Sequence, residues 1–246
     1  MIMSTYAISD IHGNRKIADY VIQLANEGHT IYFLGDAADR GPDGWSIIKD
    51  FLRTPNIVYL MGNHEDMLIK AMRGYFMNDD EYIYSRAHEV WSWNGSQPTE
   101  QAILEENFDR ALMYYSHLCT LPLTADYVNS NNQTIHMCHS GYPYWDNEDC
   151  QPTTNDIIWD REHYSTLTWW YGEDEFVIHG HTPIPYLLKD IDPNEHIAYE
   201  DGALHYCHGH KIDIDMLTIL TGEACLIDLD TFEEIILEDT NNGQTQ

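Results

Sequence analysis

The stretch FLGDAADRGPDG, residues 33–44, decides how the chain folds. The apolar run IYFL at 31–34 has the composition of a buried strand. It stops at a glycine, and Asp36, Asp39 and Arg40 follow at once. A strand that ends in two carboxylates and a guanidinium indicates either a solvated surface loop or a site for metal ions and phosphate.

Four other expected strands end in the same way. They cover residues 5–8, 57–61, 134–138 and 176–178. The motifs at the ends of the five strands are, in chain order, SDIHGN, GDAADRG, GNHE, CHSGYP and HGHTP. Because functional groups in open α/β sheets collect at the carboxyl ends of strands, we expect the five motifs to meet at one edge.

Helices are predicted between the first strands. Apolar residues recur with helical spacing over 14–27, 45–52 and 65–72. This alternation of strands and helices favours βαβ units and a mostly parallel sheet, within a fold of the α/β (α+β mixed) class. Residues 74–120, rich in Tyr, Trp, Asp and Glu, predict a helical insertion or cap.

The C-terminal part has a different pattern. From residue 212 onward, the segments LTIL and ACLIDLD on either side of a TGE turn predict an antiparallel hairpin. We expect one domain over residues 1–240 and a disordered tail over 241–246.

The charge and residue composition of the chain limits the kinds of molecule that it is expected to bind. The net charge is −29, from 12 basic and 41 acidic residues, and such a surface repels nucleic acid and anionic membranes. Neither a bilayer-spanning apolar run nor a signal-like N-terminus is present, which predicts a cytoplasmic protein. Five scattered cysteines without CxxC spacing predict free thiols. The oligomeric state is left open.

The side chains in the five motifs suit hard or borderline divalent ions. Carboxylate, imidazole and amide oxygen ligands favour Mn, Fe or Zn, and no thiolate is among them. The candidates exceed what one ion needs, so two ions that share a bridging carboxylate fit better. Such a pair lowers the pKa of a water and neutralises phosphoryl charge, while a free histidine protonates the leaving group.

The ordered motifs resemble the calcineurin-like metallophosphoesterases. GDAADRG has the GDxxDRG form, which resembles the phosphoprotein phosphatase branch, including small bacterial and phage serine/threonine phosphatases. The motifs span Asp10 to His181, most of the chain. The resemblance implies a four-layer fold in which helices flank two packed mixed β-sheets. It also implies two divalent metal ions, with Mn expected and Fe or Zn as alternatives.

The resemblance further implies a role for each motif residue. As metal ligands it implies Asp10 and His12 at the first ion, and Asn63, His139 and His181 at the second. Asp36 would bridge the two ions. His64 would be the general acid, oriented by Asp39. Arg40, together with Arg161 from the segment IIWDRE, would bind phosphate.

The expected function is hydrolysis of a phosphomonoester on protein serine or threonine. No cysteine or serine has a nucleophile context, so a metal-activated hydroxide is expected to attack phosphorus directly. A dinucleoside polyphosphate hydrolase, such as one acting on diadenosine tetraphosphate, is the alternative enzyme. A phosphoprotein-binding module with a degenerate site is the alternative from another class. A nucleoside would need a stacking pocket, and a phosphoprotein an open groove.

Several other residues are interpreted as structural. His179 is read as an ordinary histidine at a strand end, and HYCHGH at 205–210 as a loop near the rim of the site. The tryptophans Trp91, Trp93 and the pair at 169–170 are expected to serve in packing, with substrate stacking as the alternative.

Overall fold

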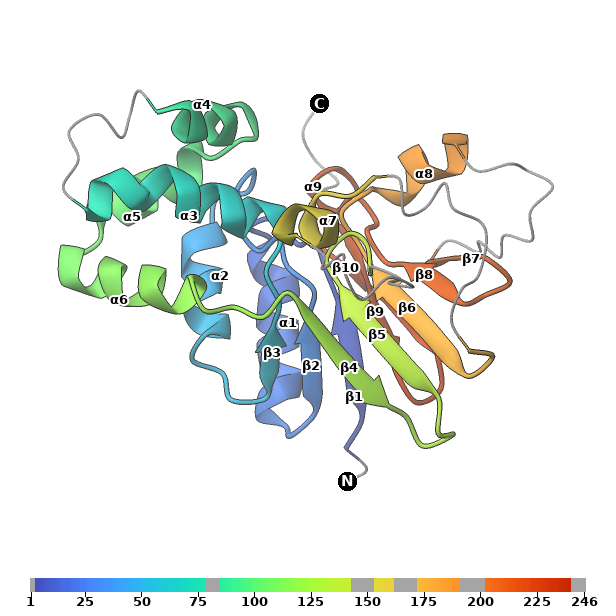
Figure 1. Cartoon of the computed structure of the whole chain (residues 1–246). Helices are drawn as coiled ribbons and strands as arrows, with labels where there is room; N and C mark the ends of the chain where they lie inside the picture. The colour runs from blue at the N-terminus through green and yellow to red at the C-terminus, as the bar shows by residue number, and fades with distance from the viewer. Residues whose placement is uncertain (1–2, 78–84, 143–152, 162–171, 191–201, 240–246) are drawn as a thin grey trace.

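The computed structural model describes residues 3–77, 85–142, 153–161, 172–190 and 202–239. These residues form two five-stranded sheets that lie next to each other (Figure 1). The first has the order β10 (Glu234–Glu238), β9 (Glu223–Asp228), β1 (Thr5–Ile8), β2 (Thr30–Phe33) and β3 (Ile57–Tyr59). The second has the order β4 (Thr124–Val128), β5 (Thr134–Cys138), β6 (Glu175–His179), β8 (Lys211–Asp213) and β7 (Leu204–Tyr206).

Both sheets are mixed. In the first, β1, β2 and β3 are parallel, whereas β9 and β10 are antiparallel to their neighbours. In the second, β5, β6 and β8 are parallel, whereas β4 and β7 run the other way. The parallel strands therefore point their carboxyl ends at one edge of each sheet, which is where the sequence motifs lie. The predicted architecture of two packed mixed sheets with flanking helices is confirmed.

The helices connect and cover these sheets. They are α1 (Arg15–Asn26), α2 (Gly44–Phe51), α3 (Asn63–Phe76), α4 (Arg86–Trp93), α5 (Gln97–Glu105), α6 (Phe108–Leu118), α7 (Thr154–Ile158), α8 (Ile184–Asp190) and α9 (Thr218–Thr221). Helices α1 to α6 gather on the side of the first sheet, and α8 lies beside the second (Figure 1). Among the described residues, no helix has both the length and the hydrophobicity of a membrane span.

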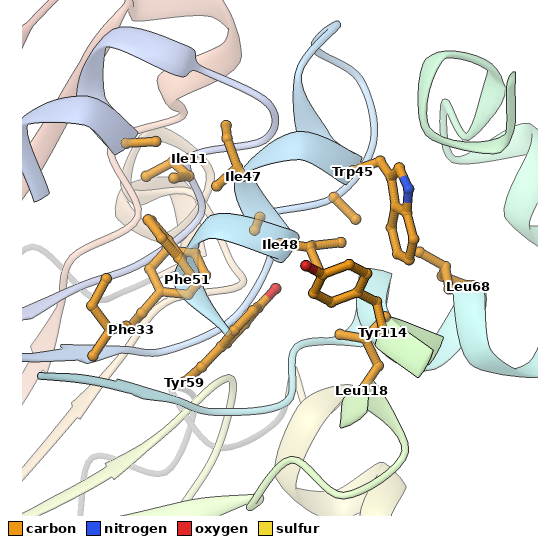
Figure 2. Close-up of a cluster of buried hydrophobic side chains, with 14 of the residues drawn as sticks. Ile11, Phe33, Trp45, Ile47, Ile48, Phe51, Tyr59, Leu68, Tyr114 and Leu118 are labelled. Atoms are coloured by element: carbon orange, nitrogen blue, oxygen red, sulfur yellow. The ribbon is translucent and has the colours of Figure 1, made fainter. Parts of the chain in front are cut away.

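Alternating side chains of the first sheet enter two different cores. On β2, Ile31 and Phe33 face a core shared with the helices, whereas Tyr32 faces the second sheet. Figure 2 shows the helical side, where Phe33 lies near Phe51 from α2. Because both faces are covered, the strands read as nearly continuous apolar runs. Each fully buried large side chain contributes about 1.5–3 kcal/mol to stability.

Two expectations for the C-terminal part are wrong. The segment LTIL is the short helix α9, and the antiparallel hairpin is formed by β9 and β10 instead. The turn at 207–210 is not near the site, because its last residue, His210, contacts the carbonyl oxygen of Glu175 at the start of β6, whereas the site lies beyond the end of that strand. Strands β4 and β7 were not foreseen. The four described cysteines are free, as predicted.

Candidate metal centre

The loops after β1 and β2 lie against each other and carry the first candidate ligands. Backbone hydrogen bonds continue past the strand ends, from Asp10 N to Gly35 O at 3.1 Å and from His12 N to Asp36 O at 3.0 Å. Asp10, His12 and Asp36 all have positive φ, of 53°, 41° and 64°. Left-handed backbone is costly for such residues, and it is typical of functional sites where the surroundings fix it.

Asp36 lies at the centre of the candidate site. Potential ligand atoms of Asp10, Asp36 and His139 all lie within 4.8 Å of one another, and so do those of His12, Asp36 and His64. All five residues are buried. Since Asp36 belongs to both groups, its carboxylate has the position that a bridge between two cations requires.

Backbone carbonyls orient two of the imidazoles toward this centre. His12 Nδ1 lies 3.0 Å from Ala38 O, and His139 Nδ1 lies 2.8 Å from Leu34 O. A carbonyl oxygen only accepts hydrogen bonds, so both Nδ1 atoms carry protons. The Nε2 atoms are then directed inward, which is the arrangement that commonly fixes metal-binding histidines.

Asn63 joins the two sheets at the site. This first residue of α3 places its Oδ1 2.8 Å from His139 Nε2 and 2.9 Å from His181 Nδ1. An amide oxygen and two imidazole nitrogens therefore converge within hydrogen-bonding distance. The remaining nitrogen, His181 Nε2, is buried and has no hydrogen-bond partner among the described residues.

The charges at the site favour cations. Burial opposes ionisation of Asp36, yet His139 and His64 hold the pKa of its carboxyl well below the usual range. Burial also works against a charged His139, but Asp36 and Asp10 raise the pKa of that imidazole to about 10. The two buried carboxylates thus favour a positive charge at this point, which divalent ions can supply.

The other two candidate ligand histidines are neutral. Burial, followed by repulsion from His64, lowers the pKa of His12 well below its ordinary value. Burial and His139 do the same to the pKa of His181, and Arg161 contributes as well. Neutral imidazole is the form that binds metal ions. With the shared carboxylate and the oriented imidazoles, this donor set fits two divalent cations.

His64 differs from His12 and His139 in the partner of its Nδ1. Its Nδ1 lies 2.7 Å from Asp39 Oδ2, whereas the Nδ1 atoms of His12 and His139 face neutral carbonyls. Although burial opposes the charged form, Asp36 and Asp39 raise the pKa of His64. A carboxylate partner stabilises an imidazolium, which suits a proton donor. Because His64 also belongs to a possible ligand group, its acid role stays a prediction.

The two predicted phosphate-binding arginines flank the site. Arg40 is exposed and directs Nη1 to His12 Nε2 at 2.8 Å and Nη2 to His64 Nε2 at 3.1 Å. Arg161 is also exposed and lies near enough to His181 to affect its pKa. Both arginines therefore lie on the side of the candidate ligands. Phosphate binding itself stays a prediction.

Glu65 is a buried residue whose part the sequence analysis missed. Its carboxylate accepts hydrogen bonds from the backbone N–H groups of Asp36 at 2.8 Å and Ala37 at 2.9 Å, and from Tyr59 Oη at 2.8 Å. A Cβ at neighbouring Gly62 would lie 2.2 Å from Asp36 Oδ1. The GNHE motif thus holds the Asp36 loop as well as supplying site residues, a role that the motif pattern alone does not reveal.

The structural interpretations have mixed outcomes. His179 is buried and contacts Tyr206 Oη at 2.6 Å, and it belongs to neither of the two ligand groups. Trp91 is buried, but its Nε1 donates to Asp39 Oδ2 at 2.8 Å, a contact that packing alone did not predict. Trp93 is 70% exposed, and the Arg86 guanidinium lies 5.4 Å from the centroid of its ring, so its packing is on the surface. The tryptophan pair at 169–170 lies outside the described residues.

Comparisons with known proteins agree with this fold. The family model of the calcineurin-like phosphoesterases matches residues 3–212, so the chain belongs to that family. It is thus a calcineurin-like phosphoesterase, a family that works with a dinuclear divalent metal site.

Two curated relatives are nucleotide hydrolases by name. The chain is 24% identical over 203 residues to the asymmetrical bis(5'-nucleosyl)-tetraphosphatase PrpE of Geobacillus sp. (strain WCH70), covering 72% of this chain and 78% of that protein. It is 28% identical over 110 residues to the symmetrical bis(5'-nucleosyl)-tetraphosphatase of Pectobacterium atrosepticum, covering 40% of this chain and 39% of that protein.

Solved structures share the fold at low sequence identity. A protein provisionally described as a diadenosine tetraphosphatase superposes with a TM-score of 0.61 at 15% identity, over 96% of this chain and 93% of that chain. A metallophosphoesterase from Sphaerobacter thermophilus superposes with a TM-score of 0.51 at 17% identity, over 95% and 86%. These likenesses concern the fold alone.

Proposed function

We propose that the chain hydrolyses dinucleoside polyphosphates such as diadenosine tetraphosphate, with two divalent cations, expected to be Mn²⁺, at the Asp36 site. The observation that carries this choice is a groove of about 460 Å³ between α3, α4 and α7. The names of the two curated relatives support it.

The groove has the features of a nucleoside site. Trp159 forms part of its lining, along with the apolar side chains of Met67 and Val90. The ring of Trp159 lies 6.1 Å from the ring of His181, measured between centroids, so the groove adjoins the candidate ligands. A volume in this range is typical of small-molecule pockets. Stacking of a base on an aromatic side chain contributes about 1–3 kcal/mol.

Cations at the groove suit the rest of the substrate. Lys70 and Arg86 line it, although the whole chain has only 12 basic residues. Lys70 pairs with Asp66 at 2.7 Å, and Arg86 pairs with Glu89 at 2.8 Å. Since Asp66 is the one acidic residue among the described lining residues, the lining is less acidic than the chain as a whole and repels a polyphosphate less.

Each motif residue would then have its own role at the reacting phosphate. Asp10, Asp36 and their neighbouring ligands would hold the cations, which activate water and neutralise phosphoryl charge when bound. Arg40 and Arg161 would hold nonbridging oxygens by charged hydrogen bonds. His64 Nε2 would give its proton to the leaving oxygen, while Asp39 stabilises the imidazolium.

A phosphoprotein phosphatase is the second candidate, and the pair of His64 and Asp39 favours it. The leaving group from phosphoserine is an alkoxide, which needs a proton more than a nucleotide phosphate does. The GDxxDRG form at residues 35–41 points in the same direction.

The test is hydrolysis by metal-stripped protein reloaded with Mn²⁺. Diadenosine tetraphosphate and a phosphoserine/phosphothreonine peptide are compared by kcat/KM, and nucleotide products are separated by chromatography. Faster hydrolysis of the dinucleotide to ATP and AMP is expected. Faster phosphate release from the peptide would favour the second candidate. Inactivity on both substrates with Mn, Fe and Zn would instead revive a binding role.

A further inference from the structure

The segment from Ser85 to Glu105, which holds α4 and α5, contacts the loop that carries the predicted acid-orienting and phosphate-binding residues. Three hydrogen bonds reach two consecutive residues of that loop. Trp91 Nε1 donates to Asp39 Oδ2 at 2.8 Å, Asp39 N donates to Thr99 Oγ1 at 2.9 Å, and Arg40 N donates to Gly95 O at 2.9 Å. This helical segment, which the sequence predicts to be a cap, is therefore hydrogen-bonded directly to the predicted acid-orienting residue and to a predicted phosphate-binding residue.

These contacts hold an unfavourable backbone. Asp39 and Arg40 have φ values of 67° and 64°, in the left-handed region that non-glycine residues avoid. Both of their N–H groups donate to the 85–105 segment. At Gly95 an added Cβ would lie 3.2 Å from Arg40 Cγ, so the two backbones approach closely there. The helical segment thus helps to define this bend.

The Asp39 carboxylate depends on Trp91 for its orientation. Oδ2 accepts from Trp91 Nε1 and faces His64 Nδ1 at 2.7 Å, whereas Oδ1 is buried without a hydrogen-bond partner among the described residues. The side chains of Asp39, Trp91 and Thr99 are fully buried, so bulk water does not replace a lost donor. Without the indole N–H, only the contact with His64 would hold the carboxylate against rotation about its Cβ–Cγ bond.

We infer that the 85–105 segment is a clamp in which Trp91, Thr99 and the carbonyl of Gly95 position Asp39 and Arg40 for catalysis. Trp91 is the positioning residue that acts on His64 through Asp39. The inference rests on the proposed role of His64 as the proton donor to the leaving group. It assigns this segment a task at the reacting phosphate, in addition to lining the groove through Arg86 and Val90.

A second buried tryptophan supplies a matched control. Trp45 on α2 is also buried, but its Nε1 has no hydrogen-bond partner among the described residues. Both Trp45→Phe and Trp91→Phe remove an indole from the interior, and only the second removes a donor to Asp39. A difference between the two variants therefore reports the hydrogen bond, and loss of packing is common to both.

The kinetic test uses two aryl phosphates that differ in leaving group. Phenyl phosphate needs a proton donor more than p-nitrophenyl phosphate does, because phenolate is the stronger base. Trp91→Phe should lower kcat on phenyl phosphate by about 10- to 100-fold, within the range of general acid catalysis. It should have little effect on kcat for p-nitrophenyl phosphate or on the KM of either substrate. Trp45→Phe should leave the ratio of the two kcat values unchanged. Equal losses on both substrates would overturn the clamp.

A spectroscopic test does not require activity. The proton between His64 Nδ1 and Asp39 should give a low-field ¹H NMR signal that His64→Asn removes. Trp91→Phe should shift or broaden this signal, and Trp45→Phe should leave it in place. An unchanged signal in Trp91→Phe would overturn the inference. If Trp91→Phe does not fold, Thr99→Val tests the same clamp by removing the acceptor for Asp39 N.

The outcomes separate this inference from the proposed function. If His64→Asn shows no dependence on the leaving group, the acid role of His64 is wrong. If His64→Asn shows that dependence and Trp91→Phe does not, only the clamp is wrong. A wild-type protein that hydrolyses neither these aryl phosphates nor diadenosine tetraphosphate would count against the proposed function, while the NMR signal would still decide whether Trp91 positions Asp39.

Discussion

Two regions of the molecule are rich in histidine, and only one has the geometry of a metal site. At the carboxyl ends of the strands, imidazoles such as His12 and His139 are buried and point toward the shared Asp36. On the β7–β8 hairpin, His205 binds Glu234 at 2.8 Å and His210 faces Glu175 O at 2.9 Å. The hairpin histidines contact different elements, so their nitrogens do not converge.

Backbone strain does not distinguish these regions. Positive φ occurs at Asp36 and His181 in the site, and also at Cys207 and His208 in the hairpin turn. What differs is the direction of the side chains and their access to solvent. Parallel strands from two sheets place candidate ligands around one buried point. The histidines of the antiparallel β7–β8 hairpin instead contact separate partners. A metal site therefore requires ligand side chains that converge on one point, and a high local content of histidine is not sufficient.

The largest expected effect comes from Asp36→Asn. This change removes the carboxylate common to both ligand groups, so the protein should lose bound Mn²⁺ and hydrolysis together. Loss of several kcal/mol of charge stabilisation lowers the rate by about 10⁴-fold or more. Metal content by mass spectrometry and kcat/KM measure the two effects. Glu234→Gln, which alters the carboxylate partner of His205, is the control and should change neither.

His64→Asn should have the next largest effect. The variant keeps the shared Asp36 and should retain its metal, but it loses the imidazole held by Asp39 at 2.7 Å. A fall in kcat of about 10²–10⁴-fold is expected for a lost general acid. If metal content falls as much as activity does, His64 is a ligand of the group with His12 and Asp36, and the acid assignment is wrong.

Much of this contrast could be predicted from the sequence, because it depends on where strands end. The apolar run 31–34 and the polar residues after it identify both the strand and its functional edge. The segment LTIL was wrongly predicted to be a strand because a short apolar run fits a strand as well as a helix. Most of this segment lies in the helix α9. The hairpin at 207–210 was placed at the wrong end because strand pairing decides this, and one sequence does not show pairing.

Contacts between residues that are distant in the sequence could not be predicted, for the same reason. Trp91 and Asp39 are 52 positions apart, and no local pattern marks the indole as a donor to that carboxylate. Glu65 is part of the recognised GNHE motif, yet its bonds to the Asp36 loop become visible only when α3 lies beside that loop. The motifs thus identify candidate residues, whereas folding determines which side chains hold them in place.

Trp159→Ala should have a smaller effect, confined to substrate binding. If a base stacks on this indole, KM for diadenosine tetraphosphate should rise by about 5- to 150-fold, which corresponds to the 1–3 kcal/mol of a stacked base. Steady-state kinetics should show little change in kcat. Trp93→Ala, which removes an exposed indole from nearby α4, is the control. Similar changes in both variants, or none in Trp159→Ala, would remove the support for a nucleoside in this groove.

The smallest effect is expected from His205→Gln, which tests the other side of the comparison. The His205 and Glu234 side chains are 23% and 25% exposed, and the substitution removes their ion pair. Pairs of this kind contribute about 0–1 kcal/mol, so the free energy of unfolding in urea should fall by no more than that. Activity and bound Mn²⁺ should stay at the wild-type level. A loss of metal would mean that the hairpin also binds cations, and convergence at a sheet edge would then no longer separate the two histidine-rich regions.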